Sequence, residues 1–249
     1  QSNFRGSTGH GRAYTFASNG DYGNGRVQQD IVEGVRWLLA QGIGDKDRVG
    51  IVGHSFGGYS TLVGLTFQPD LFKVGVAGSP PSDLGWSMRW LVNVGEQGDL
   101  PDRSLKQTLA ALSLDSTEPA TYARLHAQSP LVNAQRMQRP LLIIAGGADR
   151  TVAIREVVTY TATLKAANRP VSLLVEPNGG HSPTDPVPRE AYLYGMEAML
   201  QKHLGGAPRR ARPHAAGPAA RHAGPAFAHP RSRQQGAAQP GRTLSGQPP

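Results

Sequence analysis

A serine at position 55 lies within the heptapeptide Gly-His-Ser-Phe-Gly-Gly-Tyr, residues 53–59. The apolar run 49–52 precedes this heptapeptide, and the helix-like segment 60–67 follows it. Glycines two positions to either side relieve the crowding of a sharp strand-to-helix turn, and such a turn pushes the serine side chain outward. The pattern predicts that Ser55 is a nucleophile at a strand end. The structural alternative, a serine that caps the helix, is compatible with this role.

A serine hydroxyl is a weak nucleophile until a neutral imidazole removes its proton and an acid orients that imidazole. Asp149 follows the apolar run 141–144, and His181 follows the apolar run 171–175. If both runs are parallel strands, both residues lie beyond their carboxyl ends, where sites form in such sheets. The order nucleophile, acid, base is that of an α/β-hydrolase. The alternatives are a turn-forming or helix-capping role for Asp149 and a solvated loop position for His181.

Apolar runs that alternate with helical periodicity predict the elements that position these residues. Strands are expected at 48–52, 73–77, 141–144 and 171–175, and helices at 27–41, 60–68, 154–167 and 189–204. Segment 83–137 is expected to be helical and irregular, and 1–24 to be loop. This alternation predicts an α/β fold with a mostly parallel sheet covered by helices on both faces.

The positive charge of the chain is concentrated at its carboxyl end. The formal net charge is +8, but the segment Gly205 to Pro249 holds seven arginines and no Asp or Glu, which leaves +1 for the first 204 residues. This Ala/Pro/Gly/Arg-rich tail is too poor in apolar residues to fold, so residues 205–249 are expected to be disordered and 1–204 to be one domain. A nucleic-acid-binding arm is the alternative, which the near absence of stacking aromatics disfavours. A shifted reading frame would produce the same composition.

Composition also limits the chemistry. The chain has no cysteine, so disulfide and thiolate chemistry are excluded. No metal-ligand cluster or phosphate loop is found, and no apolar run reaches the ~20 residues of a membrane span. We therefore expect no cofactor, no metal, and no nucleic-acid or membrane partner. The sequence leaves a cytoplasmic and a periplasmic or secreted location equally open.

With these residues identified, the chain resembles the catalytic domain of the prolyl oligopeptidase family of serine peptidases. The matching stretches are residues 3–7, 29–30, 34–38, 47–49, 53–59, 69–72, 146–152 and 179–181. The resemblance covers residues 3–204 and implies hydrolysis of short peptides through a serine ester.

The resemblance assigns roles to individual residues. It implies that Ser55 is the nucleophile, Asp149 the acid and His181 the base. The backbone N–H of Phe56 is expected to be one oxyanion donor, and the Phe56 and Val152 side chains are expected to be walls of the substrate pocket. Trp86, together with Trp90, is expected to help line that pocket, with an ordinary core role as the alternative.

Two departures from the family pattern affect the function. The Asn-Phe-Arg-Gly-Ser segment, residues 3–7, normally follows the fourth strand of the sheet but here begins the chain. The opening strands, a tyrosine that supplies the second oxyanion donor, and a propeller or other access-filtering domain have no counterpart. We therefore expect this chain to be part of a longer polypeptide with an upstream domain, and to expose an apolar sheet edge when expressed alone.

Three functions follow from the sequence. The first is a serine peptidase acting on peptide substrates, and the second is an esterase or lipase-like hydrolase with the same triad. The third is a catalytically incomplete fragment or interaction module, which the absent strands favour.

Overall fold

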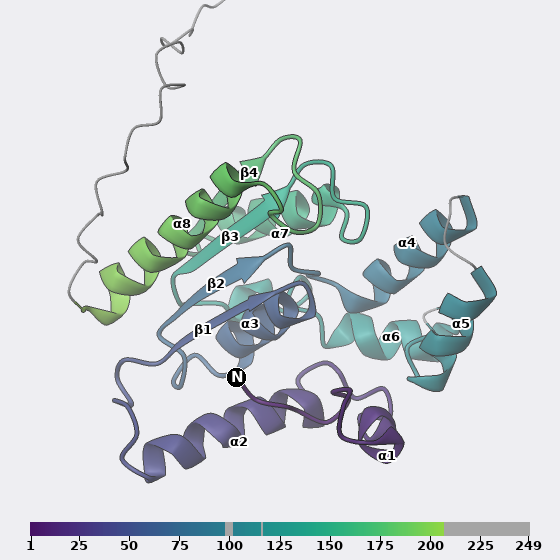
Figure 1. Cartoon of the computed structure of the whole chain (residues 1–249), viewed down its shortest axis with the longest axis horizontal. Helices are drawn as coiled ribbons and strands as arrows, with labels where there is room; N and C mark the ends of the chain where they lie inside the picture. Colours follow the sequence, from purple (N-terminus) through teal and green to yellow (C-terminus); the bar gives the residue numbers. More distant parts are fainter. Residues whose placement is uncertain (98–101, 116, 207–249) are drawn as a thin grey trace, which may run out of the picture. The chain divides into compact units, whose positions relative to one another are not determined.

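The computed structural model describes residues 1–97, 102–115 and 117–206, and within them four parallel strands form one sheet. The strands are β1 (Gly50–His54), β2 (Val74–Gly78), β3 (Leu141–Gly146) and β4 (Val171–Glu176), in that order across the sheet (Figure 1). The register aligns their carboxyl ends, since His54 lies beside Gly78 and Gly78 beside Ile144. The loops that follow the strands therefore leave from one edge of the sheet.

Helices cover both faces of the sheet. On one face lie α3 (Phe56–Phe67) and α7 (Ile154–Ala166), with α2 (Arg26–Ala40) against α3; α8 (Pro186–Leu204) covers the other (Figure 1). Successive strand residues alternate between these faces. In β2, a side chain at position 75 would meet Leu65 of α3, whereas one at 78 would meet Tyr192 of α8. The predicted α/β-hydrolase fold with a parallel sheet is confirmed.

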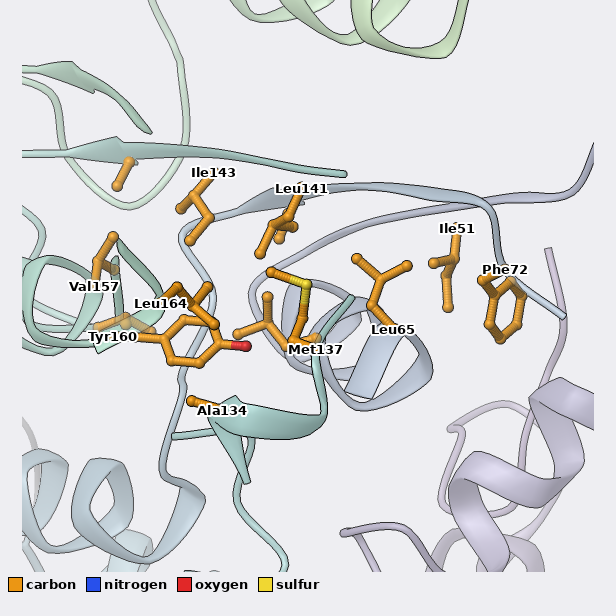
Figure 2. Packing of buried hydrophobic residues seen from close by; sticks show 14 of the residues in the cluster. Ile51, Leu65, Phe72, Ala134, Met137, Leu141, Ile143, Val157, Tyr160 and Leu164 are labelled. Atoms are coloured by element: carbon orange, nitrogen blue, oxygen red, sulfur yellow. The ribbon is translucent and has the colours of Figure 1, made fainter. Parts of the chain in front are cut away.

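The main core lies between the sheet and the α3–α7 face. Leu141 and Ile143 of β3 point into it and meet Leu65, Met137 and Tyr160 (Figure 2). All five side chains are fully buried. The apolar runs that predicted the strands therefore supply the buried side chains that fix the sheet against its helices.

A helical segment connects β2 to β3. It comprises α4 (Leu84–Gln97), α5 (Asp102–Ala111), α6 (Pro119–Ala127) and the short 3-10 helix η1 (Ala134–Arg136). A second apolar cluster lies under this segment and includes Tyr22, Tyr59, Leu84, Leu109 and Leu125. It joins the helical segment to α3 and to the amino-terminal loop.

Several element boundaries differ from the prediction. A five-residue helix, α1 (Arg12–Phe16), lies within the segment expected to be loop, and none of its residues is buried. The helix after Ser55 begins at Phe56, not at residue 60, because the two glycines that blurred its periodicity lie inside its first turn. Helix α8 begins at Pro186, three residues early, since a proline is well suited to the first helical position.

Residues 207–249 lie outside the described part of the chain, so the disorder predicted for the tail stays a prediction. Among the described residues, none of the helices is both long enough and apolar enough to cross a bilayer. The same residues contain no cluster of three or more His, Cys, Asp or Glu side chains suited to a metal ion.

Candidate active site

Ser55 occupies the turn between β1 and α3. Its backbone has φ 56° and ψ −119°, which is uncommon for a residue with a side chain. A Cβ at Gly53 would lie 2.1 Å from the carbonyl oxygen of Gly57, so the turn excludes larger residues there. The Ser55 N–H donates to the Gly78 carbonyl at 2.8 Å, which fixes the turn to β2. Ser55 is the N-cap residue of α3, as the structural alternative predicted, but its hydroxyl makes no capping hydrogen bond.

Asp149 lies in the loop after β3 and uses its two carboxylate oxygens differently. Oδ1 accepts the backbone N–H groups of Thr151 at 2.7 Å and Val152 at 2.9 Å. Oδ2 lies 2.8 Å from Nδ1 of His181. The residue is 8 % exposed, so these contacts are shielded from water. Asp149 thus forms the turn that the structural alternative predicted and also contacts the histidine.

His181 lies in the loop after β4, which packs closely on the loop after β3. A Cβ at Gly146 would lie 2.1 Å from the Gly180 carbonyl oxygen, so glycine is required for this approach. The Asp149 carboxylate only accepts, which means that Nδ1 of His181 carries the proton. In the neutral ring Nε2 is therefore an acceptor, and it lies 2.9 Å from Oγ of Ser55.

The three predicted residues therefore form a continuous chain of hydrogen bonds from Asp149 through His181 to Ser55. Such a chain can transfer the serine proton to the imidazole as the oxygen attacks a carbonyl. Phe56, the first residue of α3, has a backbone N–H without an intrahelical partner, because the first four N–H groups of a helix have none. The role of this N–H as an oxyanion donor stays a prediction.

The structure places the three predicted pocket residues in different surroundings. The Phe56 ring packs on Phe4 at 5.6 Å between ring centroids and on Tyr22 at 5.7 Å. Val152 is 4 % exposed and belongs to the main core. Trp86 lies on α4, stacked on Trp90 with ring centroids 6.4 Å apart. Their roles as walls of the substrate pocket stay predictions.

His54 is a feature of the site that the motif did not predict. Its ring centroid lies 5.0 Å from that of His181. Burial, and next the nearby His181, lower the pKa of His54. A pocket open to solvent lies beside both histidines, and its wall also includes Ser182 and, from α8, Tyr192. The strand alternation in β1 was a usable signal, because it directs residue 54 to the α8 face.

The sequence profile described as "Prolyl oligopeptidase family" matches residues 1–207. The chain belongs to this family. Its members are serine peptidases, so the chain shares its descent with hydrolases that cleave amide bonds.

Curated relatives support the same assignment. The chain is 36% identical over 204 residues to "Dipeptidyl aminopeptidase BIII" of Pseudoxanthomonas mexicana, an alignment that covers 82% of this chain and 28% of the relative. It is 34% identical over 211 residues to "Dipeptidyl peptidase family member 6" of Caenorhabditis elegans, covering 83% of this chain and 27% of the relative. The chain thus spans just over a quarter of the length of these proteins.

Solved structures show the same fold. A puromycin-hydrolyzing peptidase from Mycobacterium tuberculosis matches with TM-score 0.72 and 25% identity, over 84% of this chain and 30% of that one. Pyrococcus horikoshii acylaminoacyl peptidase matches with TM-score 0.66 and 25% identity, over 84% of this chain and 32% of that one.

Proposed function

We propose that this chain is the catalytic part of a serine peptidase that hydrolyses short peptides through an acyl-enzyme. The observation that carries the proposal is the hydrogen-bond chain in which Nε2 of His181 lies 2.9 Å from Ser55 and Nδ1 lies 2.8 Å from Asp149. Three loops from three strand ends converge to make it, and an arrangement of this kind activates a serine for acyl transfer.

In the first half of the reaction, Oγ of Ser55 attacks the peptide carbonyl while its proton moves to Nε2 of His181. Asp149 keeps the ring in the tautomer that can accept this proton, and it stabilises the imidazolium that forms. The carbonyl oxygen becomes an oxyanion next to the Phe56 N–H. One such donor is worth about 3 to 4 kcal/mol of transition-state stabilisation.

Collapse of this tetrahedral intermediate breaks the C–N bond. His181 gives its proton to the departing amine, and the acyl group stays on Ser55 as an ester. Water then attacks the ester while His181 accepts its proton. Collapse of the second tetrahedral intermediate breaks the bond between the acyl carbon and Oγ, His181 returns the proton to Oγ of Ser55, and the acid product leaves. The described residues suffice for each proton transfer, so the mechanism requires no cofactor.

Short peptides are the proposed substrates because the named relatives are dipeptidyl and acylaminoacyl peptidases. This chain spans 28% of the first of them, so the features that select peptide length are proposed to lie in an upstream domain of a longer polypeptide. The second oxyanion donor is proposed to come from the same upstream sequence. Without it, the chain alone would be a catalytically incomplete fragment.

The substrate class can be tested with the protein expressed from its full gene. Turnover of aminoacyl and dipeptidyl p-nitroanilides, which contain an amide bond, is compared with turnover of p-nitrophenyl esters of similar size. We expect both to be cleaved, with Ser55→Ala abolishing both activities. Cleavage of esters alone would replace the peptidase proposal with an esterase, and no cleavage of either would favour a non-catalytic role.

A further inference from the structure

The segment from the last residue of β2 to the start of α4, residues 78–83, contacts the elements that carry Ser55, Asp149 and His181. At its start, the Gly78 carbonyl accepts the Ser55 N–H at 2.8 Å. The Ser79 N–H donates to the carbonyl of Ile144, in β3, at 2.7 Å. The Ser79 hydroxyl donates to the His181 carbonyl oxygen at 3.1 Å. This loop is therefore placed to hold the nucleophile and the base at a fixed separation.

Ser79 is held in an unusual conformation to make these contacts. Its φ of 41° lies in the left-handed region, although it is not a glycine. Such a backbone costs about 1 to 3 kcal/mol and persists only where surrounding contacts enforce it. The residue is 3 % exposed. If its hydrogen bond to the His181 carbonyl were lost, water could not replace that bond without a free-energy cost.

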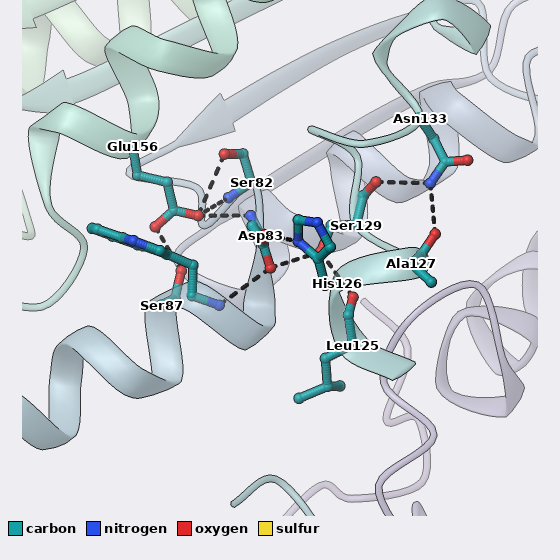
Figure 3. A network of polar contacts seen from close by, with 10 residues as sticks. Ser82, Asp83, Ser87, Leu125, His126, Ala127, Ser129, Asn133 and Glu156 are labelled. Carbon is teal, nitrogen blue, oxygen red and sulfur yellow. Dashed lines mark hydrogen bonds and ion pairs between the residues drawn. The ribbon is translucent and has the colours of Figure 1, made fainter. Parts of the chain in front are cut away.

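The far end of the loop is anchored by Glu156, in the first turn of α7 (Figure 3). Its buried Oε1 accepts the backbone N–H groups of Ser82 at 2.5 Å and Asp83 at 2.7 Å. Its Oε2 accepts the Ser87 hydroxyl at 2.6 Å. Because α7 follows the Asp149 loop directly, this anchor joins the loop to the element that carries the acid.

We propose that Ser79 is a positioning residue that holds His181 at hydrogen-bonding distance from Ser55. This inference rests on the proposed function, since it assumes that His181 is the base. Ser79 acts through the His181 main chain and does not itself contact the reacting atoms. Displacement of a catalytic group by about 1 Å can lower a rate by about 100-fold. Loss of the Ser79 hydroxyl should therefore lower kcat by about 10-fold or more and leave KM unchanged.

Two substitutions separate the hydroxyl from the backbone conformation. Ser79→Ala removes the hydroxyl and keeps the left-handed strain, whereas Ser79→Gly removes the hydroxyl and favours that conformation. If the hydroxyl positions His181, both variants lose kcat to a similar extent, and the Gly variant is at least as heat-stable as the Ala variant. Ser82→Ala is the matched control: among the described residues the Ser82 hydroxyl hydrogen-bonds to Glu156, at 3.3 Å, and the substitution should leave kcat unchanged.

The measurements are kcat and KM for a p-nitroanilide, and the rate of covalent inactivation by a fluorophosphonate, all in the protein expressed from its full gene. The inactivation rate reports the Ser55–His181 pair without peptide binding, so it should fall in parallel with kcat. Wild-type kcat in Ser79→Gly, or an increase in KM alone, would overturn the inference. A wild-type protein that neither reacts nor turns over substrate would instead overturn the proposed function, and the inference with it.

Discussion

At the scale of single residues, Asp149 divides its carboxylate between the protein backbone and the proposed base. Oδ1 accepts two N–H groups of its own turn, and Oδ2 faces Nδ1 of His181. The side chain therefore has a defined orientation. Because each oxygen has its own partners, replacing Asp149 by Asn should have a predictable effect on His181.

An Asp149→Asn variant should keep the fold and lose activity. The amide oxygen will take the position that accepts the backbone N–H groups, which turns the NH₂ group toward His181. Nδ1 must then accept, so Nε2 carries the proton and can no longer act as a base toward Ser55. We expect kcat to fall by about 10⁴-fold. The check is kcat together with the thermal midpoint, and a variant with activity within tenfold of wild type would contradict this role.

The convergence of Ser55, Asp149 and His181 could be predicted from sequence, because each follows an apolar run at a strand end. The pocket residues could not be predicted as securely, because the direction of a side chain depends on packing partners distant in sequence. Phe56 packs on Phe4 from the opening loop, and Val152 lies in the main core. Strand alternation could direct His54 to the α8 face, but its contact with His181 required the fold.

At the scale of elements, Glu156 joins the start of α7 to the start of α4. Replacement by Leu would leave the Ser82 and Asp83 N–H groups buried without acceptors, at about 1 to 3 kcal/mol for each. Gln should be tolerated, because its oxygen can accept both N–H groups while its NH₂ group donates to Ser87. The free energy of unfolding in urea should therefore fall by about 3 kcal/mol or more for Glu156→Leu and much less for Glu156→Gln. Equal losses in the two variants would show that shape, not hydrogen bonding, matters there.

The stability difference between the wild-type protein and Glu156→Gln should depend on pH. Burial raises the pKa of Glu156 above its ordinary 4.5, against the hydrogen bonds that lower it. The stabilising contribution of the protonated form is complete below the ordinary value and is lost as pH rises through the raised value. Wild type should therefore lose stability relative to Glu156→Gln as pH increases from about 4.5. A stability difference that is independent of pH would contradict a buried, titrating carboxyl.

A second element contact joins the opening loop to α2. Arg5 donates to Asp30 through its backbone N–H, its Nε and one terminal nitrogen, with the shortest distance at 2.6 Å. The Arg5 hydrogen bond lowers the pKa of Asp30 below its ordinary 3.8, so the stabilisation is present above that value and is lost as pH falls through the lowered one. Asp30→Ala should lower the free energy of unfolding by about 1 to 3 kcal/mol at pH 7. A difference that persists unchanged at pH 2 would contradict the assignment.

The strands were predictable because each contains a short apolar run, which is buried along β2 and most of β3. Helix α2 was predictable because its apolar residues recur at helical spacing. The short helix α1 was not, since none of its residues is buried and no periodic signal results. The start of α3 was also missed, because Gly57 and Gly58 are poor helix formers. Close packing requires glycine at position 58, where a Cβ would lie 2.8 Å from the Gly78 carbonyl oxygen. At the start of α3, local propensity thus gives way to packing.

At the scale of the whole molecule, β1 forms an edge of the sheet in the described part of the chain, and apolar side chains near it are exposed. Within the described residues, β1 hydrogen-bonds to β2 alone, and Val52 is 42 % exposed. Trp37 and Ile43, in and after α2, are 61 % and 56 % exposed. Exposed strand edges and apolar side chains favour association with other chains.

We therefore expect the 249-residue chain, expressed alone, to be unstable or aggregated. The protein expressed from its full gene should be more stable and more soluble. Size-exclusion chromatography and calorimetry of both proteins provide the check. A soluble monomer of the isolated chain with a sharp, cooperative thermal transition would contradict this expectation.

The central claim is that Ser55 is a nucleophile activated by His181 and Asp149, and covalent labelling tests it most directly. The protein expressed from its full gene is treated with a fluorophosphonate, and intact mass and peptide mapping locate the adduct. We predict one adduct on Ser55 in the wild-type protein and none in Ser55→Ala, with labelling of His181→Ala slowed by at least about 10³-fold. Labelling that persists in Ser55→Ala, or that proceeds at the wild-type rate without His181, would contradict the account.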